Sequence, residues 1–570
     1  MKTFHKIIIG AVGLAGTLSS CSDYLEVEPR NLVILEQFWN EKTDVDNCVA
    51  GCYEGLQSFD CMARMIAWGE FRSDNVVAAQ KAKDDDLHMY RLLTENIDPS
   101  NVYTNWSSLY TVINRCNTVM LYAPDVQKKD PSFSESDLKA IIGEVTAIRD
   151  LCYFYLIRTF RDVPYITEAY TDDDQPMDIG STPFNEILDK LINDLETVKG
   201  DVVTTYPTQI GAVNLYQYGR ITKTAIWAML CDMYLWKQDY TKCIEYADTI
   251  IGTKRKQAQE AQGIIYNNMT KYFDNYPLIN NYISTNDLGY PYFGNAYRQT
   301  FGSFVSDEIL FELYFTQNDN QLANGAVSTY YGNPDNGWYF RVSPSTYVAS
   351  DVSNKTYKLF VNDKDARNYE NMLSSSQIAK YVLHTHQTQV PTTGSPTSFG
   401  LGSWSKDKNH SSWILYRLTD IMLMKAEALT KQATSDTDPK LTEAYEIARV
   451  INKRSLLINP DNITPTSTYL LKMPTTDQKN AVENLVFQER QRELMFEGKR
   501  WYDLVRRSMR DGNTNYLTQQ MANKGLQNSA VVNSRLQKME AMFLPCNLEE
   551  CKVNKNLWKN PSYTFDTSVK

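Results

Sequence analysis

A block of acidic and basic side chains lies between Gln488 and Glu493. Two of its carboxylates, Glu489 and Glu493, could in principle act as the acid and base that cleave a glycosidic bond. Arg490 and Arg492 alternate with them, and nearby positive charges keep carboxylates ionised and therefore poor proton donors. Residues three apart lie on one side of a helix, so we expect the ion pairs Glu489–Arg492 and Arg490–Glu493 within one helix. This pattern indicates a structural block rather than a catalytic one.

Few residues elsewhere in the chain are candidates for metal binding or nucleophilic catalysis. His384 and His386 would share one face of a strand, but no further metal ligands accompany them. The acidic run Asp84-Asp85-Asp86 lacks a complete calcium-coordination pattern, which leaves a structural calcium ion open. We find no nucleophile elbow, phosphate-binding loop or metalloprotease motif. The sequence therefore predicts no catalytic residue, no cofactor and no metal site, and a protein that is not an enzyme.

Aromatic side chains in loops suit a different chemistry, the binding of sugars. The apolar faces of sugar rings lie on flat aromatic rings, while sugar hydroxyls pair with planar groups such as those of Asn, Asp and Arg. Two aromatic clusters flanked by turn residues occur in a long loop-rich region, and a polar cluster occurs nearer the N-terminus. The candidate ligand-contacting residues are Tyr290, Tyr292, Phe293, Trp338 and Tyr339, with Arg72, Asp74 and Asn75 as polar contacts. The alternative for each aromatic residue is ordinary packing under a loop.

The N-terminus indicates export and a lipid anchor. A short basic start precedes an apolar run, Ile7 to Leu18, that is too short to span a bilayer but suits the core of a signal peptide. The run ends in Leu18-Ser19-Ser20-Cys21, which has the form of a bacterial lipobox. We therefore expect residues 1–20 to be a lipoprotein signal peptide. Acyl chains on Cys21 would hold the mature chain, residues 21–570, at a membrane. An ordinary secretory signal with an incidental cysteine is the alternative.

Composition excludes one class of partner and limits the disulfides. The net charge is -10 and the basic residues are scattered, whereas nucleic-acid binding needs clustered Lys and Arg. There are ten cysteines, so nine remain once Cys21 is acylated, and at least one thiol stays unpaired within the chain. Cys48 and Cys52, like Cys546 and Cys551, are close in sequence without a histidine at zinc-finger spacing. We interpret both pairs as small buried hydrophobic residues.

Helix pairs make up most of the predicted scaffold. Apolar residues recur at intervals of three and four in the segments 105–122, 136–160, 183–198, 220–236, 240–251, 413–430 and 441–454. Short polar turns such as Lys237-Gln238-Asp239 join neighbouring segments, which favours antiparallel pairs. Small residues, including Ala225 and Ala228, let the paired helices approach closely. We expect a mainly α fold whose helix pairs resemble tetratricopeptide repeats (TPR). The helical tryptophans Trp106, Trp227 and Trp501 are assigned to its core or to the seams between its helices.

The remaining segments are less regular. We place the helical scaffold at about 30–261 and 406–508 and a large loop-rich insertion at about 262–405. Short β-strands are expected within the insertion, at Glu308 to Phe315 and at Ile378 to Leu383. Residues 509–570 are expected to be irregular. Loops of this length in a helical protein usually carry function or are flexible.

A set of short motifs, taken in order, carries a family resemblance. They are Asp23-Tyr24-Leu25 after the lipobox, Phe38-Trp39, Gly51-Cys52-Tyr53, Gly143-Glu144-Val145 with Ala147-Ile148-Arg149, Tyr153-Phe154-Tyr155-Leu156 with Asp162-Val163-Pro164, Gly219-Arg220, Tyr416-Arg417-Leu418-Thr419-Asp420-Ile421, Glu489-Arg490, Glu497-Gly498-Lys499-Arg500-Trp501-Tyr502-Asp503-Leu504 and Phe543-Leu544-Pro545. Over essentially the whole chain the sequence resembles the SusD/RagB family of Bacteroidetes. The Pro545-Cys546 segment is less typical of that family.

The resemblance implies a function that the helix periodicity does not reveal. It implies a nutrient-binding lipoprotein on the outer face of the outer membrane, with a TonB-dependent SusC-like barrel as partner. The expected function is therefore to capture an oligosaccharide or polysaccharide and deliver it to that transporter. A binder of peptides or other nutrients, an exported glycoside hydrolase and a purely structural TPR adaptor are the alternatives. The sequence does not name the ligand, because specificity lies in variable loops.

Overall fold

The computed structural model of the protein describes most of the chain. The described residues are 38–171, 175–207, 216–261, 272–284, 292–302, 306–315, 323–332, 339–343, 359–360, 364–374, 377–389, 397–404 and 408–565. The predicted signal peptide and Cys21 lie outside these ranges. The described residues are mainly helical and form small scattered sheets, which confirms the predicted fold class. Within the same ranges, no helix is both long and apolar enough to cross a membrane.

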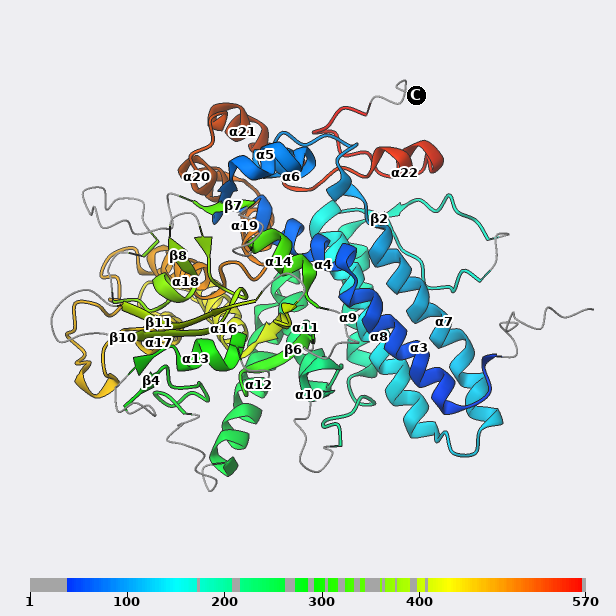
Figure 1. The fold of residues 1–570 in the computed structure, drawn as a ribbon, viewed down its shortest axis with the longest axis horizontal. Helices are drawn as coiled ribbons and strands as arrows, with labels where there is room; N and C mark the ends of the chain where they lie inside the picture. Colours follow the sequence, from blue (N-terminus) through cyan, green and yellow to red (C-terminus); the bar gives the residue numbers. More distant parts are fainter. Residues whose placement is uncertain are drawn as a thin grey trace, which may run out of the picture.

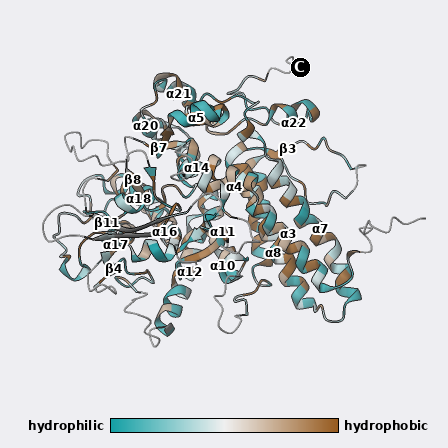
Figure 2. Cartoon of the chain, in the orientation of Figure 1, coloured by the Kyte–Doolittle hydropathy of each residue, from teal (hydrophilic) through white to brown (hydrophobic). Residues whose placement is uncertain are grey.

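Long helices from the N-terminal third form one side of the molecule (Figure 1). They are α3 (Lys42–Gln57), α7 (Ser107–Lys129), α8 (Glu135–Phe160) and α9 (Phe184–Val198). Each packs against the next in this order, and the predicted pairing of segments 105–122 and 136–160 is confirmed as α7 and α8. Figure 2 shows many apolar residues along these helices, and the apolar residues of each helix are largely the buried ones. The array is therefore held by apolar contact between neighbouring helices.

Helix α8 illustrates why these elements form. Ser134 caps its N-terminus by accepting a hydrogen bond from the backbone N–H of Asp137 at 3.1 Å. Glu135 and Asp137 lie in the first turn, where negative charge complements the helix dipole. The helix ends where Arg161 adopts a left-handed φ of 72°. Almost every residue from Gly143 to the end of the helix is buried, so α8 is the central helix of the array.

A second run of antiparallel helices continues the scaffold. It consists of α11 (Lys223–Lys237), α12 (Tyr240–Ala261), α16 (Leu418–Gln432), α17 (Pro439–Arg454) and α18 (Gln478–Leu494), each packed on the next. The predicted turn between α11 and α12 is confirmed, with Gln238 in the left-handed conformation at φ 64°. Ala225 and Ala228 are fully buried in α11. Helices α12 and α16 are adjacent although the whole insertion separates them in sequence.

One helix start differs from its prediction. The segment from Trp413 to Arg417 was expected to open the helix of residues 413–430, but it forms strand β12. It pairs antiparallel with β6 (Ile309–Leu313), and helix α16 begins only at Leu418. The reason is that the bulky aromatic and aliphatic residues of this segment are all buried as a strand. Strand β6 agrees with the prediction for Glu308 to Phe315.

The insertion is built from short strands and helical turns. Its four-stranded sheet has the order β11 (Thr397–Ser403), β10 (Leu383–Gln389), β5 (Tyr292–Phe293), β4 (Tyr282–Ile283). Strands β8 (Met372–Ser374) and β9 (Gln377–Ile378) pair with each other, and β7 (Phe340–Val342) pairs with β1 (Val76–Ala78) outside the insertion. Its other short elements are α13 (Asn295–Tyr297), η4 (Arg298–Gly302), α14 (Gly325–Tyr331) and α15 (Arg367–Glu370), while β2 (Val163–Pro164), β3 (Ser181–Thr182) and α10 (Tyr216–Gly219) lie before the insertion. The β1–β7 pair ties the insertion to the N-terminal helices.

The C-terminal region is more regular than expected. Residues 509–570 contain the end of α19 (Arg500–Asp511), α20 (Asn515–Asn523), α21 (Ser529–Leu536), the 3₁₀ turn η8 (Met539–Met542) and α22 (Leu548–Val553). Helices of six to nine residues present too few turns to establish a period of 3.6 in the sequence. Cys546 and Cys551 form a disulfide, which corrects their interpretation as hydrophobic residues. The seven other cysteines in the described ranges are unpaired.

A buried network of ion pairs joins the insertion to the scaffold. Glu493 of α18 lies 3.1 Å from Arg367, 2.7 Å from Arg417 and 2.9 Å from Arg454. Burial alone would raise the pKa of the Glu493 carboxyl, but the three guanidinium groups hold it well below its usual range. This agrees with the structural interpretation of the charged block.

One of the two ion pairs predicted within that block is present. Glu489 and Arg492 lie 2.9 Å apart as expected. Arg490 does not pair with Glu493, because its guanidinium contacts Asp420 at 2.6 Å and Asp503 at 2.9 Å instead. Both of these partners come from other helices, α16 and α19. The block therefore connects helices rather than stabilising a single one.

Candidate ligand-binding surface

The first aromatic cluster is largely buried where the structure describes it. Tyr290 lies outside the described residues. Tyr292 and Phe293 form β5 and are each 5% exposed. The Phe293 ring packs at 5.1 Å from the ring of Tyr282 and belongs to a small hydrophobic cluster with Leu457. The described part of this cluster therefore contributes to packing of the four-stranded sheet, and this packing is the alternative that the sequence left open.

The polar candidates are also buried. Arg72 donates to both carboxylate oxygens of Glu95, at 2.7 and 2.9 Å, and its guanidinium lies over the Trp501 ring. Asp74 accepts from Arg500 at 2.7 Å, and Asn75 donates to Glu70 at 2.8 Å. All three candidates are at most 3% exposed. This placement argues against direct ligand contact by Arg72, Asp74 and Asn75 and gives them a structural role.

The second aromatic cluster lies beside the polar segment. Trp338 is outside the described residues, but Tyr339 directly precedes β7 and its carbonyl accepts a hydrogen bond from the Ala79 N–H at 3.0 Å. The half-buried Tyr339 ring has the Lys81 ammonium 4.9 Å from its centre. The β1–β7 pairing therefore brings the 70–75 segment close to Tyr339 and Phe340, the described part of this cluster. It does not bring the 290–293 cluster to them, because β5 belongs to a different sheet.

A row of aromatic rings that the sequence did not indicate lies next to this pairing. Phe59 begins helix α4 (Phe59–Ile66) and is 47% exposed. Its ring centre is 6.2 Å from that of Tyr330 in α14 (Gly325–Tyr331), which in turn lies 6.5 Å from Tyr103 in η3 (Val102–Thr104). Phe71 and Phe340 pack beneath Tyr330. Three distant segments contribute to the row, so no local motif could have revealed it.

Polar groups accompany the row. The Tyr103 hydroxyl donates to Asp86 at 3.0 Å, and the Arg64 guanidinium lies 5.5 Å from the centre of the Tyr103 ring. Burial, with Tyr330 and Asp86 as neighbours, raises the pKa of Tyr103, so its hydroxyl stays protonated. Leu87, which opens α6 (Leu87–Leu93), and Val102 are 51% and 43% exposed. Tyr103 and Tyr330 are only 3% and 4% exposed, so they support the surface from beneath. The exposed Phe59 ring and the half-buried Tyr339 ring are the ones it offers to a ligand, beside hydrogen-bonding groups, and this is the combination that a sugar requires. We call it the aromatic surface, defined by Phe59, Asp86, Leu87, Val102, Tyr103, Tyr330 and Tyr339.

The segment beneath this surface is fixed by a close backbone crossing. The π-helical turn η2 (Ala67–Phe71) passes against the loop between α18 and α19 at Gly498. Glu70 accepts hydrogen bonds from the backbone N–H groups of Phe496 and Gly498, both at 3.2 Å. Burial raises the pKa of Glu70 to about 7, although these hydrogen bonds oppose the shift. Trp68 in the same turn donates to the carbonyl of Tyr103 at 2.7 Å, which connects the crossing to the aromatic surface.

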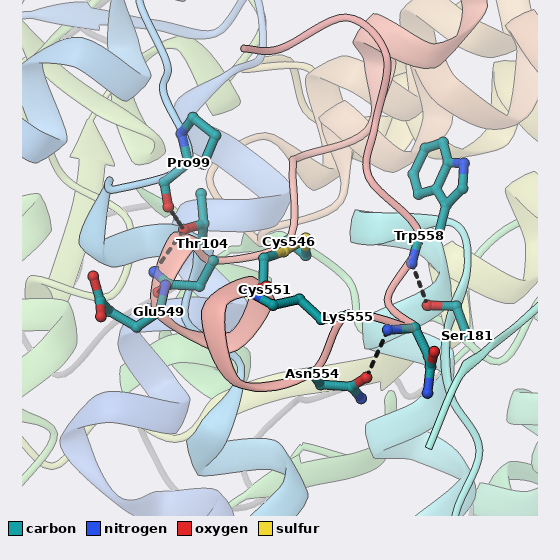
Figure 3. Close-up of a disulfide and its surroundings, with 11 residues drawn as sticks. Pro99, Thr104, Ser181, Cys546, Glu549, Cys551, Asn554, Lys555 and Trp558 are labelled. Atoms are coloured by element: carbon teal, nitrogen blue, oxygen red, sulfur yellow. Dashed lines mark hydrogen bonds between the residues drawn. A yellow bond between two sulfur atoms is a disulfide. The ribbon is translucent and has the colours of Figure 1, made fainter. Parts of the chain in front are cut away.

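The disulfide between Cys546 and Cys551 lies beside the segment that carries Pro99 and Thr104 (Figure 3). Helix α22 begins beside it, and the N–H of Leu548 donates to the carbonyl of Pro99 at 2.8 Å. Asn547 donates to the Thr104 hydroxyl at 2.9 Å. Since Thr104 ends the η3 turn that carries Tyr103, the disulfide-closed loop supports one edge of the aromatic surface. The chain beyond it is held to β3 by the Trp558 N–H, which donates to Ser181.

Metal-ligating groups are not assembled in the described ranges, where no cluster of three His, Cys, Asp or Glu could hold a metal ion. His384 stacks on Trp404 at 4.9 Å between ring centres. The side chain of His386 lies outside the described part. Asp86 is occupied as the N-cap of α6 and as the acceptor for Tyr103. The carboxylates of Glu489 and Glu493 in α18 pair with arginine side chains, as described above.

These features define the class of protein: a mainly helical scaffold of TPR-like pairs that carries an aromatic surface where a long insertion meets the N-terminal helices. Residues 252–563 match the model of the SusD family, and residues 23–235 match a model described as starch-binding and associating with the outer membrane. The chain therefore belongs to the SusD family, as its sequence resemblance indicated.

Known relatives are similar to this chain over nearly its full length. A SusD-like protein, P38, of Formosa agariphila is 26% identical over 531 residues, which cover 89% of this chain and 92% of the relative. A SusD superfamily protein of known structure from Bacteroides thetaiotaomicron has a TM-score of 0.61 at 22% identity and covers 92% of this chain and 99% of its own. A laminarin-binding SusD-like protein has a TM-score of 0.57 at 18% identity, with 92% and 100% covered. These structural likenesses establish the fold.

Proposed function

We propose that the protein is a cell-surface lipoprotein that binds a glycan and delivers it to a TonB-dependent SusC-like transporter without altering it chemically. Membership of the SusD family supports glycan binding, as does the description of the N-terminal match as starch-binding. A solved relative of the same fold binds laminarin. The partnership with a SusC-like barrel rests on the family resemblance.

The observation that carries the proposal is the aromatic surface. Isolated exposed apolar residues are ordinary, but here three of them, Phe59, Leu87 and Val102, gather around the Tyr103 and Tyr330 rings. Asp86, which accepts from the Tyr103 hydroxyl, and Lys81, whose ammonium lies beside the Tyr339 ring, are the polar groups next to them. Trp338, a candidate from the sequence analysis, directly precedes Tyr339 in the chain. We include it in the proposed site.

Replacing Phe59 by alanine is expected to weaken glycan binding about 10- to 100-fold, the usual effect of truncating an aromatic residue at the centre of a binding surface. The melting temperature should change little, because the ring is only half buried. Trp338→Ala should behave in the same way. Isothermal titration of the mature protein with a panel of glycans, laminarin oligosaccharides included, measures the affinity.

The matched control is Tyr216→Ala, which removes an exposed aromatic ring from α10, away from the aromatic surface. It should leave glycan affinity unchanged. Equal losses of glycan affinity in the Phe59 and Tyr216 variants would contradict the assignment of the binding site to the aromatic surface. Released product during titration would favour a hydrolase, and heat only with peptides would favour a peptide binder.

Membrane attachment is proposed to depend on Cys21. The family model matched by residues 23–235 is described as associating with the outer membrane, which supports this placement. Metabolic labelling with a clickable fatty acid should mark the protein but not its Cys21→Ala variant. Label that persists in the variant would contradict a lipid anchor at this residue.

A further inference from the structure

A second hollow lies apart from the aromatic surface, at the far end of the scaffold helices. It is a pocket of about 570 Å³ between the C-terminal half of α12, helix α17 and the segment 463–470. Pockets of this size hold ligands as large as a short oligosaccharide. None of its lining residues belongs to the aromatic surface.

The walls of this pocket are fixed by hydrogen bonds. The Tyr445 hydroxyl of α17 donates to the Leu471 carbonyl at 2.9 Å, and the Leu471 N–H donates to Asn452 at 3.1 Å. These two bonds hold the 463–470 segment over α17. On the opposite side, Asp274 and Asn275 form a tight turn with φ angles of 45° and 66°. The pocket is therefore a built feature of the fold rather than a gap between loose loops.

Its lining carries an excess of positive charge. Lys453 pairs with Asp274 at 2.8 Å, and Arg449 pairs with Glu446 at 2.7 Å. The third cation, Arg255, has no carboxylate partner in the described part of the chain. One of its terminal nitrogens donates to the Asn275 carbonyl at 3.3 Å. Its buried Nε–H has no hydrogen-bond partner there.

Resting on the glycan-binding function proposed above, we propose that this pocket binds a sugar unit that carries one carboxylate, such as a uronic acid. Three cations face two carboxylates, so one negative charge from a ligand would balance the lining. A guanidinium pairs with a carboxylate through planar, charge-assisted hydrogen bonds, and the Arg255 guanidinium, which no carboxylate neutralises in the described part of the chain, is the group left for it. Tyr276 and Pro465 supply apolar surface for the sugar ring.

The test is isothermal titration of the mature protein with tri-galacturonate and with its neutral counterpart, in which each carboxyl is reduced to a hydroxymethyl group. The acidic sugar should bind at least tenfold more tightly than the neutral one. Arg255→Met, which keeps the bulk of the side chain without its charge, should weaken tri-galacturonate binding about 10- to 100-fold. Arg255→Lys should restore part of the loss, since the charge returns without the planar geometry.

The matched control is Lys256→Met, which removes the same charge from the next residue of α12. The Lys256 side chain is 79% exposed, outside the pocket, and its variant should bind tri-galacturonate within twofold of the unmodified protein. An equal loss in the Lys256 variant would show attraction by diffuse charge and would overturn the proposal. So would equal affinity of the protein for the acidic and neutral sugars.

The Phe59→Ala variant separates this proposal from the proposed function. It should lose affinity for neutral glycans and keep Arg255-dependent binding of tri-galacturonate. Loss of tri-galacturonate binding in the Phe59 variant would place the acidic sugar on the aromatic surface and overturn the pocket. If tri-galacturonate bound in an Arg255-dependent way and no neutral glycan bound at all, the result would support the pocket. It would contradict the glycan binding proposed for the aromatic surface.

Discussion

Replacing Glu493 by glutamine is expected to lower the free energy of unfolding by about 3–5 kcal/mol, the usual cost of removing one partner from a buried ion pair. Glu493 is 4% exposed and contacts the guanidinium groups of Arg367, Arg417 and Arg454. Arg367, Arg417 and Arg454 each keep another carboxylate partner. Those carboxylates balance the network only together with Glu493, so its loss leaves one buried positive charge without a counter-charge. The midpoint of urea unfolding measures the effect.

The pH dependence of stability gives this prediction a second readout. The folded-state pKa of Glu493 lies well below its ordinary value of 4.5. A group with a depressed pKa contributes stability above its unfolded-state pKa and loses that contribution as the pH falls through its folded-state pKa. The difference in stability between the two proteins should therefore be full at pH 7 and shrink below pH 4.5.

An exposed pair provides the control. Glu186 pairs with Lys190 one turn away on α9, and both side chains are exposed. Glu186→Gln removes the same charge and should change the stability by no more than about 0.5 kcal/mol. Similar effects of the Glu186 and Glu493 substitutions would show that the buried network does not hold the insertion to the scaffold.

Much of the scaffold was predictable because its determinants are local. The apolar stripe of α12, the Lys237-Gln238-Asp239 turn and the small residues of α11 all act within a few positions of one another. The strand at Trp413 was not predictable, because its pairing partner β6 lies about a hundred residues earlier. An apolar run of five residues fits either a strand or the start of a helix until that partner is known.

The site was harder to predict for the same reason. Sequence reasoning favoured aromatic residues beside turns, which led to Tyr339 of the proposed surface but also to the buried Tyr292 and Phe293. It did not identify Phe59 or Tyr330, since both lie in helices, where aromatic residues usually face the core. Only the tertiary packing of α4 against α14 leaves Phe59 exposed and places the two rings together.

Replacing Gly69 by alanine is expected to destabilise the fold by about 3 kcal/mol or more, the upper range for overpacking, and to weaken glycan binding as well. A Cβ at this position would lie 1.7 Å from the backbone oxygen of Gly498. No side chain can rotate away to relieve this clash, because both contacting groups belong to the backbone. The turn η2 or the Gly498 loop must move, and Gly498 is itself held at a left-handed φ of 67°.

The expected loss of binding follows from what the turn carries. Trp68 adjoins Gly69 and donates to the Tyr103 carbonyl, and the chain then runs through β1, which pairs with the strand after Tyr339. A displaced turn would therefore shift two parts of the aromatic surface. Thermal melting and glycan titration of the Gly69→Ala variant measure both effects.

Gly252→Ala is the control, because a Cβ there meets no atom within 4 Å. An alanine in place of that helical glycine should stabilise the protein by about 0.5–1 kcal/mol. A Gly69→Ala variant with unchanged melting temperature and affinity would show that the crossing does not position the surface.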